Sequence, residues 1–299
     1  METRLRLDPY LTLVVRPPAL VQLGASATGA PVLRPPPWLT PDATAGLLRW
    51  MQRYHTPQEL HRRAADAGLT DGDVAELLRA LHGHGLLHSE PGPTDLRVYL
   101  QGRGAVTDSV LNEIAALEGV HVTAGTTRGW SPVGRDIDLV LLTDTLAPDP
   151  VLVRRLMRSR LPHLPVVVRD GVGVIGPLVL PGASPCLRCL DHTRTDADPG
   201  WPSLACQLFG RTGRAAPQIL RMTAAMAALQ ISAVAAGAGS DAPAPANVDD
   251  GRLTSVHDDA TAVLGCTLEV QGSGIAMRRW LMHPNCGCGG ALTAGEPAG

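Results

Sequence analysis

Two pairs of cysteines, far apart in the chain, restrict its fold more than any other feature. Cys186 and Cys189 are separated by two residues, and Cys286 and Cys288 by one. Four thiolates at this spacing can close one tetrahedral shell around Zn²⁺, the arrangement of structural zinc sites. Such a shell has no open coordination position, so the metal would hold structure and would not activate water. We therefore predict a structural zinc site formed by two distant segments.

The residues around both pairs suit tight metal-binding turns. Residues 181–185 are rich in proline and glycine, and Gly287 separates the last two cysteines. Glycine lets backbone amides approach the sulfurs without a Cβ in the way. Two other interpretations stay open: reduced thiols that only pack, and a redox CxxC pair, although a redox pair would not need the second couple. We expect no disulfides, because no signal peptide precedes the chain and its length is ample for a core.

Composition excludes several classes of function. The 299 residues, 44% of them apolar, are enough for two domains with cores. The net charge of −2 gives no general attraction to nucleic acid or membranes. All 26 basic residues are arginine, which excludes a lysine Schiff base and the lysine of P-loops. The longest apolar stretch, residues 222–236, is too short to span a bilayer, so we expect a soluble, cytoplasmic protein.

The first 92 residues predict a winged-helix module. Residues 20–35 have the alternation and the turn residues of a β-hairpin. Three helix starts follow, marked by Thr40 before a proline and by Thr56 and Thr70 as capping residues. Residues 86–88 then predict a short returning strand.

The charges of the third predicted helix indicate what this module binds. The helix carries Asp71, Asp73 and Glu76 against a single Arg79, which is the wrong sign for phosphate contacts. DNA binding is therefore the less favoured interpretation. We expect the hairpin edge and the third helix to form a groove for an extended peptide, held by strand addition. We assign no ligand role to the nearby histidines, His82, His84 and His88.

A βαβ unit follows, with a strand at residues 96–100, a helix, and a strand at 120–122. Gly102 and Gly104 form the turn between the first strand and the helix, where Rossmann-like folds approach a nucleotide. The fingerprint is incomplete, since Thr107 stands at the third glycine position. No acidic residue after the second strand is placed to hold a ribose.

The rest of the chain predicts the remainder of an α/β domain. Strands are expected at residues 138–142, 165–168, 172–180, 253–257 and 267–271, and helices at residues 150–159 and 217–236. The segment after the first cysteine pair is expected to be loose, and the alanine-rich helix 217–236 to be buried. Residues 90–94 and 241–251 read as linkers, and residues 291–299 as a flexible tail.

From residue 96 to residue 288 the order of parts resembles the ThiF/MoeB superfamily, the bacterial relatives of ubiquitin-activating enzymes. The resemblance rests on Asp138-Leu139-Val140, on Asp144, on the glycine-bearing arm before Pro185 and on the two cysteine couples. It implies a domain that binds ATP, adenylates the C-terminal carboxylate of a small protein and forms homodimers. It also implies that Gly102 and Gly104 line the phosphates and that Asp144 assists adenylation through Mg²⁺.

The chain departs from that pattern at the positions that carry the chemistry. The third glycine, the ribose-binding acid, the nucleotide-contacting lysine and the Asn-Leu-x-Arg-Gln-like segment are missing. Arg128 and Arg135 are candidates for the missing arginine only by proximity in the sequence. Adenylation needs preorganised cations for the developing phosphate charge. We therefore expect a degenerate domain without adenylyltransferase activity of its own, for which ATP and Mg²⁺ are doubtful cofactors.

The predicted fold class is α/β, with a winged helix at residues 1–92 before a Rossmann-like, ThiF-type domain with a zinc-binding subdomain at residues 93–290. This fusion resembles the partner proteins of azole- and azoline-forming peptide biosynthesis, the cyclodehydratase or leader-peptide-binding proteins. The resemblance implies that the winged helix captures a leader peptide and that a separate YcaO-type enzyme performs ATP-dependent cyclisation. The leading hypothesis is a zinc-stapled scaffold that presents a peptide to a modifying enzyme. The alternatives are an adenylyltransferase or cyclodehydratase that uses Gly102, Gly104 and Asp144, and a DNA-binding regulator.

Three further residues near the cysteine pairs carry expectations. In the resembling enzymes a cysteine after the first pair can carry a thioester, and Cys206 lies in such a segment. No histidine or arginine beside it in the sequence activates it, so a buried packing thiol is favoured, as for Cys266. His283 precedes the last pair and is expected to lie beside the ligands, because four cysteines already fill the shell.

Overall fold

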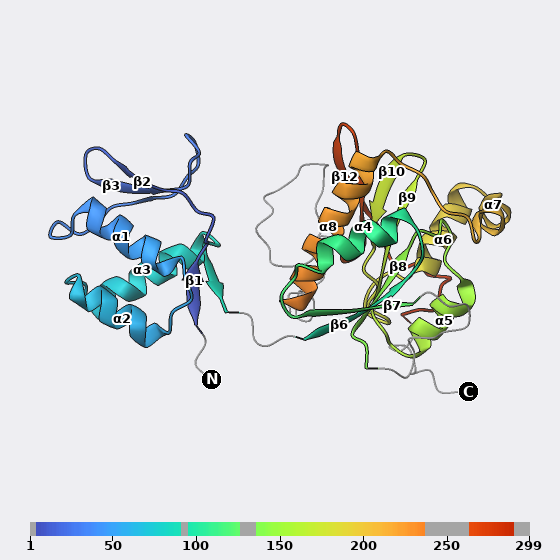
Figure 1. Ribbon diagram of the computed structural model, residues 1–299, viewed down its shortest axis with the longest axis horizontal. Coiled ribbons are helices and arrows are strands. Elements are labelled where there is room, and N and C mark those ends of the chain that lie inside the picture. The colour runs from blue at the N-terminus through green and yellow to red at the C-terminus, as the bar shows by residue number, and fades with distance from the viewer. Residues whose placement is uncertain (1–3, 91–94, 126–135, 237–262, 290–299) are drawn as a thin grey trace, which may run out of the picture. The chain divides into compact units, whose positions relative to one another are not determined.

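The computed structural model describes residues 4–90, 95–125, 136–236 and 263–289. The chain divides into two compact units, Met1–Gly92 and Pro93–Gly299, and each is described by itself (Figure 1). The predicted linkers, the predicted strand at 253–257 and the predicted tail lie wholly or largely outside the described residues.

Within its described residues, the first unit consists of three helices and two small sheets. The helices are α1 (Pro41–Met51), α2 (Pro57–Asp66) and α3 (Asp71–Gly83). Strands β2 (Leu13–Arg16), β3 (Leu20–Leu23) and β4 (Val32–Leu33) form one antiparallel sheet, and β1 (Leu5–Leu7) pairs with β5 (Leu87–Ser89). The predicted hairpin and helices are present, and the predicted strand at residues 86–88 corresponds to β5, which pairs with β1. A three-residue strand such as β1 has too little alternation to be found from sequence.

Threonine caps begin all three helices of this unit. Thr40 accepts a hydrogen bond from the first turn of α1, and Thr56 and Thr70 each take part in a capping box. These bonds satisfy amides at the helix starts that otherwise lack intrahelical partners. The apolar faces of the helices meet in a core that includes the fully buried Leu48 and Leu81.

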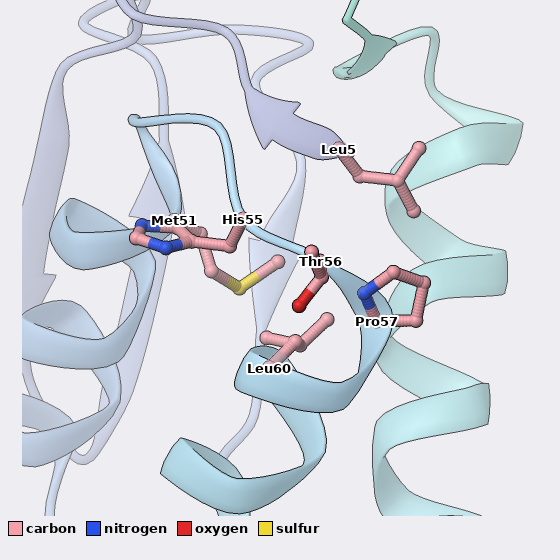
Figure 2. A pocket seen from close by; sticks show the side chains of 6 residues that line it. All are labelled: Leu5, Met51, His55, Thr56, Pro57 and Leu60. Atoms are coloured by element: carbon pink, nitrogen blue, oxygen red, sulfur yellow. The ribbon is translucent and has the colours of Figure 1, made fainter. Parts of the chain in front are cut away.

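A small cavity lies beside the start of α2. Figure 2 shows the six residues of its wall: Leu5, Met51, His55, Thr56, Pro57 and Leu60. The cavity has a volume of about 10 Å³, which is room for roughly one water molecule. We therefore interpret it as a packing gap between β1 and α2 and not as a ligand site.

The second unit is built on one mixed sheet of seven described strands, in the order β12-β11-β10-β9-β8-β6-β7. The strands are β6 (Leu96–Gln101), β7 (Val120–Gly125), β8 (Leu139–Thr143), β9 (His163–Arg169), β10 (Val172–Ile175), β11 (Cys266–Gln271) and β12 (Gly274–Arg279). Strands β7, β6, β8 and β9 are parallel, and β10 to β12 continue the sheet in antiparallel pairs. The strand order reverses at β6, which lies between β7 and β8, so their carboxyl ends flank a topological switch point.

Helices cover both faces of this sheet. One core contains α4 (Ala105–Ile114) and α8 (Pro217–Ala235), and the other contains α5 (Pro150–Arg158) and the start of α6 (Leu187–Ala197) (Figure 1). Alternation along β6 explains the two cores: Val98 and Leu100 face the first, and Tyr99 faces the second.

Helix α8 is the one described helix long and apolar enough to cross a membrane by length and composition. The apolar stretch therefore extends further than the sequence indicated. Its buried face, which includes Ala224, Ala227 and Ile231, packs into the first core, as predicted. We interpret α8 as a core helix of this unit.

Several predicted elements need correction. The segment after the first cysteine pair is not loose, because α6 and a further helix, α7 (Trp201–Leu208), follow Cys186. The predicted arm at 172–180 ends as a strand at Ile175, two residues before Pro177, which has no N–H for a sheet ladder. Strand β12 was missed because all six of its residues are exposed and show no alternation.

His163 is a buried titratable group at the start of β9. Its Nδ1–H donates to the Leu161 carbonyl at 3.0 Å, and its Nε2 is buried without a partner among the described residues. Burial lowers the pKa of His163 to about 4. The unfolded chain therefore binds a proton that the folded chain does not, at every pH between about 6.5 and the folded value.

We expect the stability of the second unit to fall as the pH drops from 6.5 towards 4, on the order of 3 kcal/mol over the whole interval from this histidine. His163→Gln removes the titration, so its midpoint of thermal unfolding should change less between pH 7 and pH 5 than that of the wild type. The exposed His121→Gln variant is the control. Equal pH slopes for wild type and His163→Gln would contradict the assignment.

Candidate functional site

The structure brings the four predicted cysteines together. The Sγ atoms of Cys186 and Cys189 lie 3.8 Å apart, those of Cys186 and Cys286 3.4 Å, and those of Cys189 and Cys288 3.3 Å. All four sulfurs lie within 4.8 Å of one another. A tetrahedron with Zn–S bonds of about 2.3 Å has sulfurs roughly 3.8 Å apart. The set can therefore hold a metal ion, and its dimensions are compatible with zinc.

The local backbone structure orients the side chains of both cysteine pairs towards one centre. Cys186 is the N-cap residue of α6 and Cys189 lies in its first turn, where the helix dipole favours anionic sulfur. Gly287 has a φ of +68°, a left-handed conformation that side chains rarely adopt. This turn lets Cys286 and Cys288 point towards one centre although a single residue separates them.

Burial makes most thiols of the cluster hard to ionise. Burial raises the pKa of the Cys186 thiol to about 12, and those of Cys286 and Cys288 to about 11. Burial acts on Cys189 in the same direction, but hydrogen bonds from the His283 backbone and from neighbouring groups outweigh it and lower its pKa. Without a metal, at least three of the sulfurs would be neutral at pH 7. A divalent ion supplies the charge that lets four adjacent thiolates ionise together.

His283 lies beside the cluster and not in it. Its Nδ1 accepts a hydrogen bond from the Asn285 amide at 3.2 Å, so Nε2 carries the proton and donates to Asp196 at 2.8 Å. The ring also stacks on His192. Both ring nitrogens are used, which fixes the loop that carries Cys286.

The glycine turn after β6 is occupied by a side chain of the protein itself. Asp144, only 5% exposed, follows β8, and its carboxylate accepts hydrogen bonds from the amides of Val106 at 3.1 Å and Thr107 at 3.2 Å. The Thr107 hydroxyl donates to the same carboxylate. These amides form the start of α4, the position where Rossmann-like folds bind a phosphate.

The two glycines of the turn allow this approach. A Cβ on Gly104 would lie 2.7 Å from Asp144 Oδ1, and one on Gly102 would overlap the Thr143 hydroxyl. Asp144 itself has a φ of +66°, in the left-handed region that aspartate tolerates better than most residues. Gly102, Gly104 and Asp144 thus form one packed network. A nucleotide phosphate could reach the start of α4 only if Asp144 moved away.

Other predicted residues have simpler positions. Arg128 and Arg135 lie outside the described residues. Cys266 is buried, as expected, but Cys206 is exposed on α7, so its predicted burial was wrong. The helical periodicity of residues 201–208 places Cys206 away from the core, and this helix was not recognised in the sequence. Among the described residues the four cysteines are the one group that could hold a metal, and no histidine joins them.

A groove of about 430 Å³ lies in the first unit, between β4 and α3. Leu33 and Arg34 lie on its strand side, and Glu76, Leu77 and Ala80 on its helix side. Its place agrees with the predicted groove. In the part of the chain that is described, β4 pairs only with β3, so its other edge has unpaired backbone groups.

Sequence reasoning missed a second cavity, of about 300 Å³, in the second unit. Arginines from three separate elements line it, Arg169 on β9, Arg194 on α6 and Arg278 on β12. No local motif joins residues so far apart in the chain. Arg169, at the end of β9, was the one signal in a predicted strand, because β12, which carries Arg278, was not predicted.

We expect Cys186→Ser to abolish metal binding and to lower the midpoint of thermal unfolding by about ten degrees or more, since metal binding contributes directly to folding. Metal content per chain, measured by mass spectrometry on the purified protein, should fall from one zinc to none. Cys206→Ser is the matched control and should keep both metal and stability. A folded, metal-free Cys186→Ser protein of wild-type stability would refute the site.

Asp144→Ala should destabilise the second unit by about 2 kcal/mol, because it leaves two buried amides and a hydroxyl without their acceptor. Asp144→Asn, which keeps the backbone preference and one acceptor oxygen, should cost about half as much. Asp108→Ala, at an exposed position in the same helix, is the control. Denaturant unfolding distinguishes them, and equal losses for Asp144→Ala and Asp108→Ala would contradict the role given to Asp144.

No protein-family model matches the sequence, and no curated protein does. Solved structures match the fold. A heterocyclase in complex with substrate and cofactor gives a TM-score of 0.62 at 17% identity, over 96% of this chain and 39% of its own. The heterocyclase TruD gives 0.60 at 15% identity, over 96% of this chain and 42% of its own.

MccB of E. coli, solved with ATP, gives a TM-score of 0.58 at 10% identity, over 96% of this chain and 99% of its own. The structure of MccB with MccA gives 0.57 at 11% identity, with the same coverage. This chain therefore spans about two fifths of the heterocyclases and nearly all of MccB. At the level of the fold, the predicted resemblance is confirmed: this chain has the fold of these heterocyclases and of MccB.

Proposed function

We propose that the chain is a peptide-binding scaffold that works with a separate modifying enzyme in ribosomal peptide maturation. In this proposal, the first unit is a winged helix that captures a leader peptide, and the second is held by a structural zinc ion. The observation that carries the proposal is the groove of about 430 Å³ between the open edge of β4 and helix α3.

The groove offers the two kinds of contact that an extended peptide needs. The open edge of β4 has backbone donors and acceptors that an added strand could pair with. The half-buried Leu77 and the buried Leu47 and Leu81 supply apolar surface for alternate side chains of that strand. Glu76 and Asp73 give the α3 side negative charge, which suits a peptide better than a phosphate backbone.

In the second unit, the closed glycine turn supports a role without nucleotide chemistry. Asp144 occupies the amides at the start of α4 with its own carboxylate. A YcaO-type partner would then supply ATP-dependent cyclisation, and the zinc-stapled unit would serve as its docking scaffold. Homodimerisation, implied by the family resemblance, is part of the same proposal.

An adenylyltransferase or cyclodehydratase is the second candidate, because MccB, solved with ATP, has this fold. It would require Asp144 to leave the start of α4 and to bind Mg²⁺ instead. ATP–pyrophosphate exchange in the presence of a peptide substrate would be its signature, and Asp144→Ala would abolish that exchange.

The peptide proposal is tested by selecting binders for the full chain from a displayed library of random peptides. Ala80→Arg fills the groove from α3. It should weaken binding of the selected peptides by about tenfold or more, since it blocks the apolar contacts. Ala75→Arg places the same side chain on the same helix outside the groove, and should leave binding unchanged. Equal binding by both variants, or no enriched peptide, would overturn the proposal.

A further inference from the structure

The arginine-lined cavity of the second unit lies on the face of the sheet opposite α4 and α8. Its floor is formed by residues of β9 and β11, among them Val167 and Glu269. Their neighbours along each strand belong to the first core, so these residues face the other side of the sheet. Helix α6 and Trp201 form one wall, and Trp280 also lines the cavity. Its volume of about 300 Å³ is at the lower limit of small-molecule sites.

Two of the three guanidinium groups of the cavity are positioned by aromatic rings. Arg194 lies over the ring of Trp201, with 4.7 Å between its Cζ and the ring centroid, and 5.4 Å from that of Trp280. Arg278 lies 5.7 Å from the centroid of Trp280. Such contacts hold a guanidinium in place while leaving its edge free for hydrogen bonds.

The charges of the cavity do not balance. Asp191 lies 3.4 Å from Arg194 and also accepts a hydrogen bond from the Trp201 indole at 3.1 Å, and Glu269 lies 3.6 Å from Arg278. Among the described residues no carboxylate pairs with Arg169. Three guanidinium groups thus face two carboxylates, which leaves one positive charge.

The three arginines of the cavity also repel one another. The pKa of Arg194 is lowered by burial and by the charges of Arg169 and Arg278. Like charges that lie close together in a partly buried space repel one another, and a bound anion would reduce this repulsion.

We propose that this cavity binds a carboxylate, held by Arg169 and Arg194, whose carbon body extends along the apolar wall. One excess positive charge matches a monoanion, and the planar guanidinium fork matches the two oxygens of a carboxylate. The apolar wall continues into an adjoining cavity of about 790 Å³, which shares Leu146, Leu187 and Trp201 with the first. The carboxylate can come from a free organic acid or from the C-terminus of a peptide.

The test is calorimetry on the full, zinc-loaded chain. N-benzoylglycine is the probe for a free acid, and its amide, N-benzoylglycinamide, has nearly the same shape without the charge. A hexapeptide ending in phenylalanine, with a free or an amidated C-terminus, probes the second source. Inorganic phosphate is the third ligand. The variants are Arg169→Gln and, as a matched control on the opposite face of the sheet, the exposed Arg221→Gln.

We expect at least one free carboxylate to bind and its amide to bind about tenfold more weakly or not at all. Arg169→Gln should weaken binding of the carboxylate by about the same factor, and Arg221→Gln should leave its binding unchanged. The tighter of the two carboxylates identifies the source. The proposal is overturned if neither carboxylate binds, if the amides bind as well as the acids, if phosphate binds as tightly as the better carboxylate, or if Arg169→Gln binds like the wild type.

Discussion

The convergence of four sulfurs is the constraint on which the second unit depends. It joins the start of α6 to a loop that follows β12, two segments about a hundred residues apart in the chain. The same closure fixes the first turn of α6, and α6 carries Asp191 and Arg194 into the neighbouring cavity. Burial alone keeps most of these thiols neutral, whereas a divalent metal ion would let the four thiolates ionise together and would join the two segments.

At the switch point of the sheet, a side chain of the protein occupies the position where many folds of this kind bind a ligand. A glycine turn and a helix start normally expose amides to an anionic ligand. Here the anion is internal, since Asp144 accepts from the amides of Val106 and Thr107. The glycines remain necessary, because any Cβ at Gly102 or Gly104 would collide with this network. A glycine pattern at this turn is therefore not by itself evidence for nucleotide binding.

Sequence reasoning succeeded where the signal was local or strongly spaced. Threonine caps located the three helices of the first unit, and the cysteine spacing located the cysteine cluster. It failed where tertiary context decides. Strand β1 is too short to show a pattern, β12 is exposed on both faces, and the segment with Cys206 is helical although its composition looked irregular. The contact of Asp144 with α4 could not be predicted either, because it depends on a positive φ and on the pairing of β6 with β8.

We propose that the second unit provides structure and not nucleotide chemistry. Calorimetric titration of ATP with Mg²⁺ into the zinc-loaded, full-length chain tests it most directly. We predict no binding in the micromolar to low millimolar range, because Asp144 already occupies the amides that a phosphate would need. Saturable binding in the micromolar range would contradict this view and would favour an adenylating enzyme in which Asp144 moves aside.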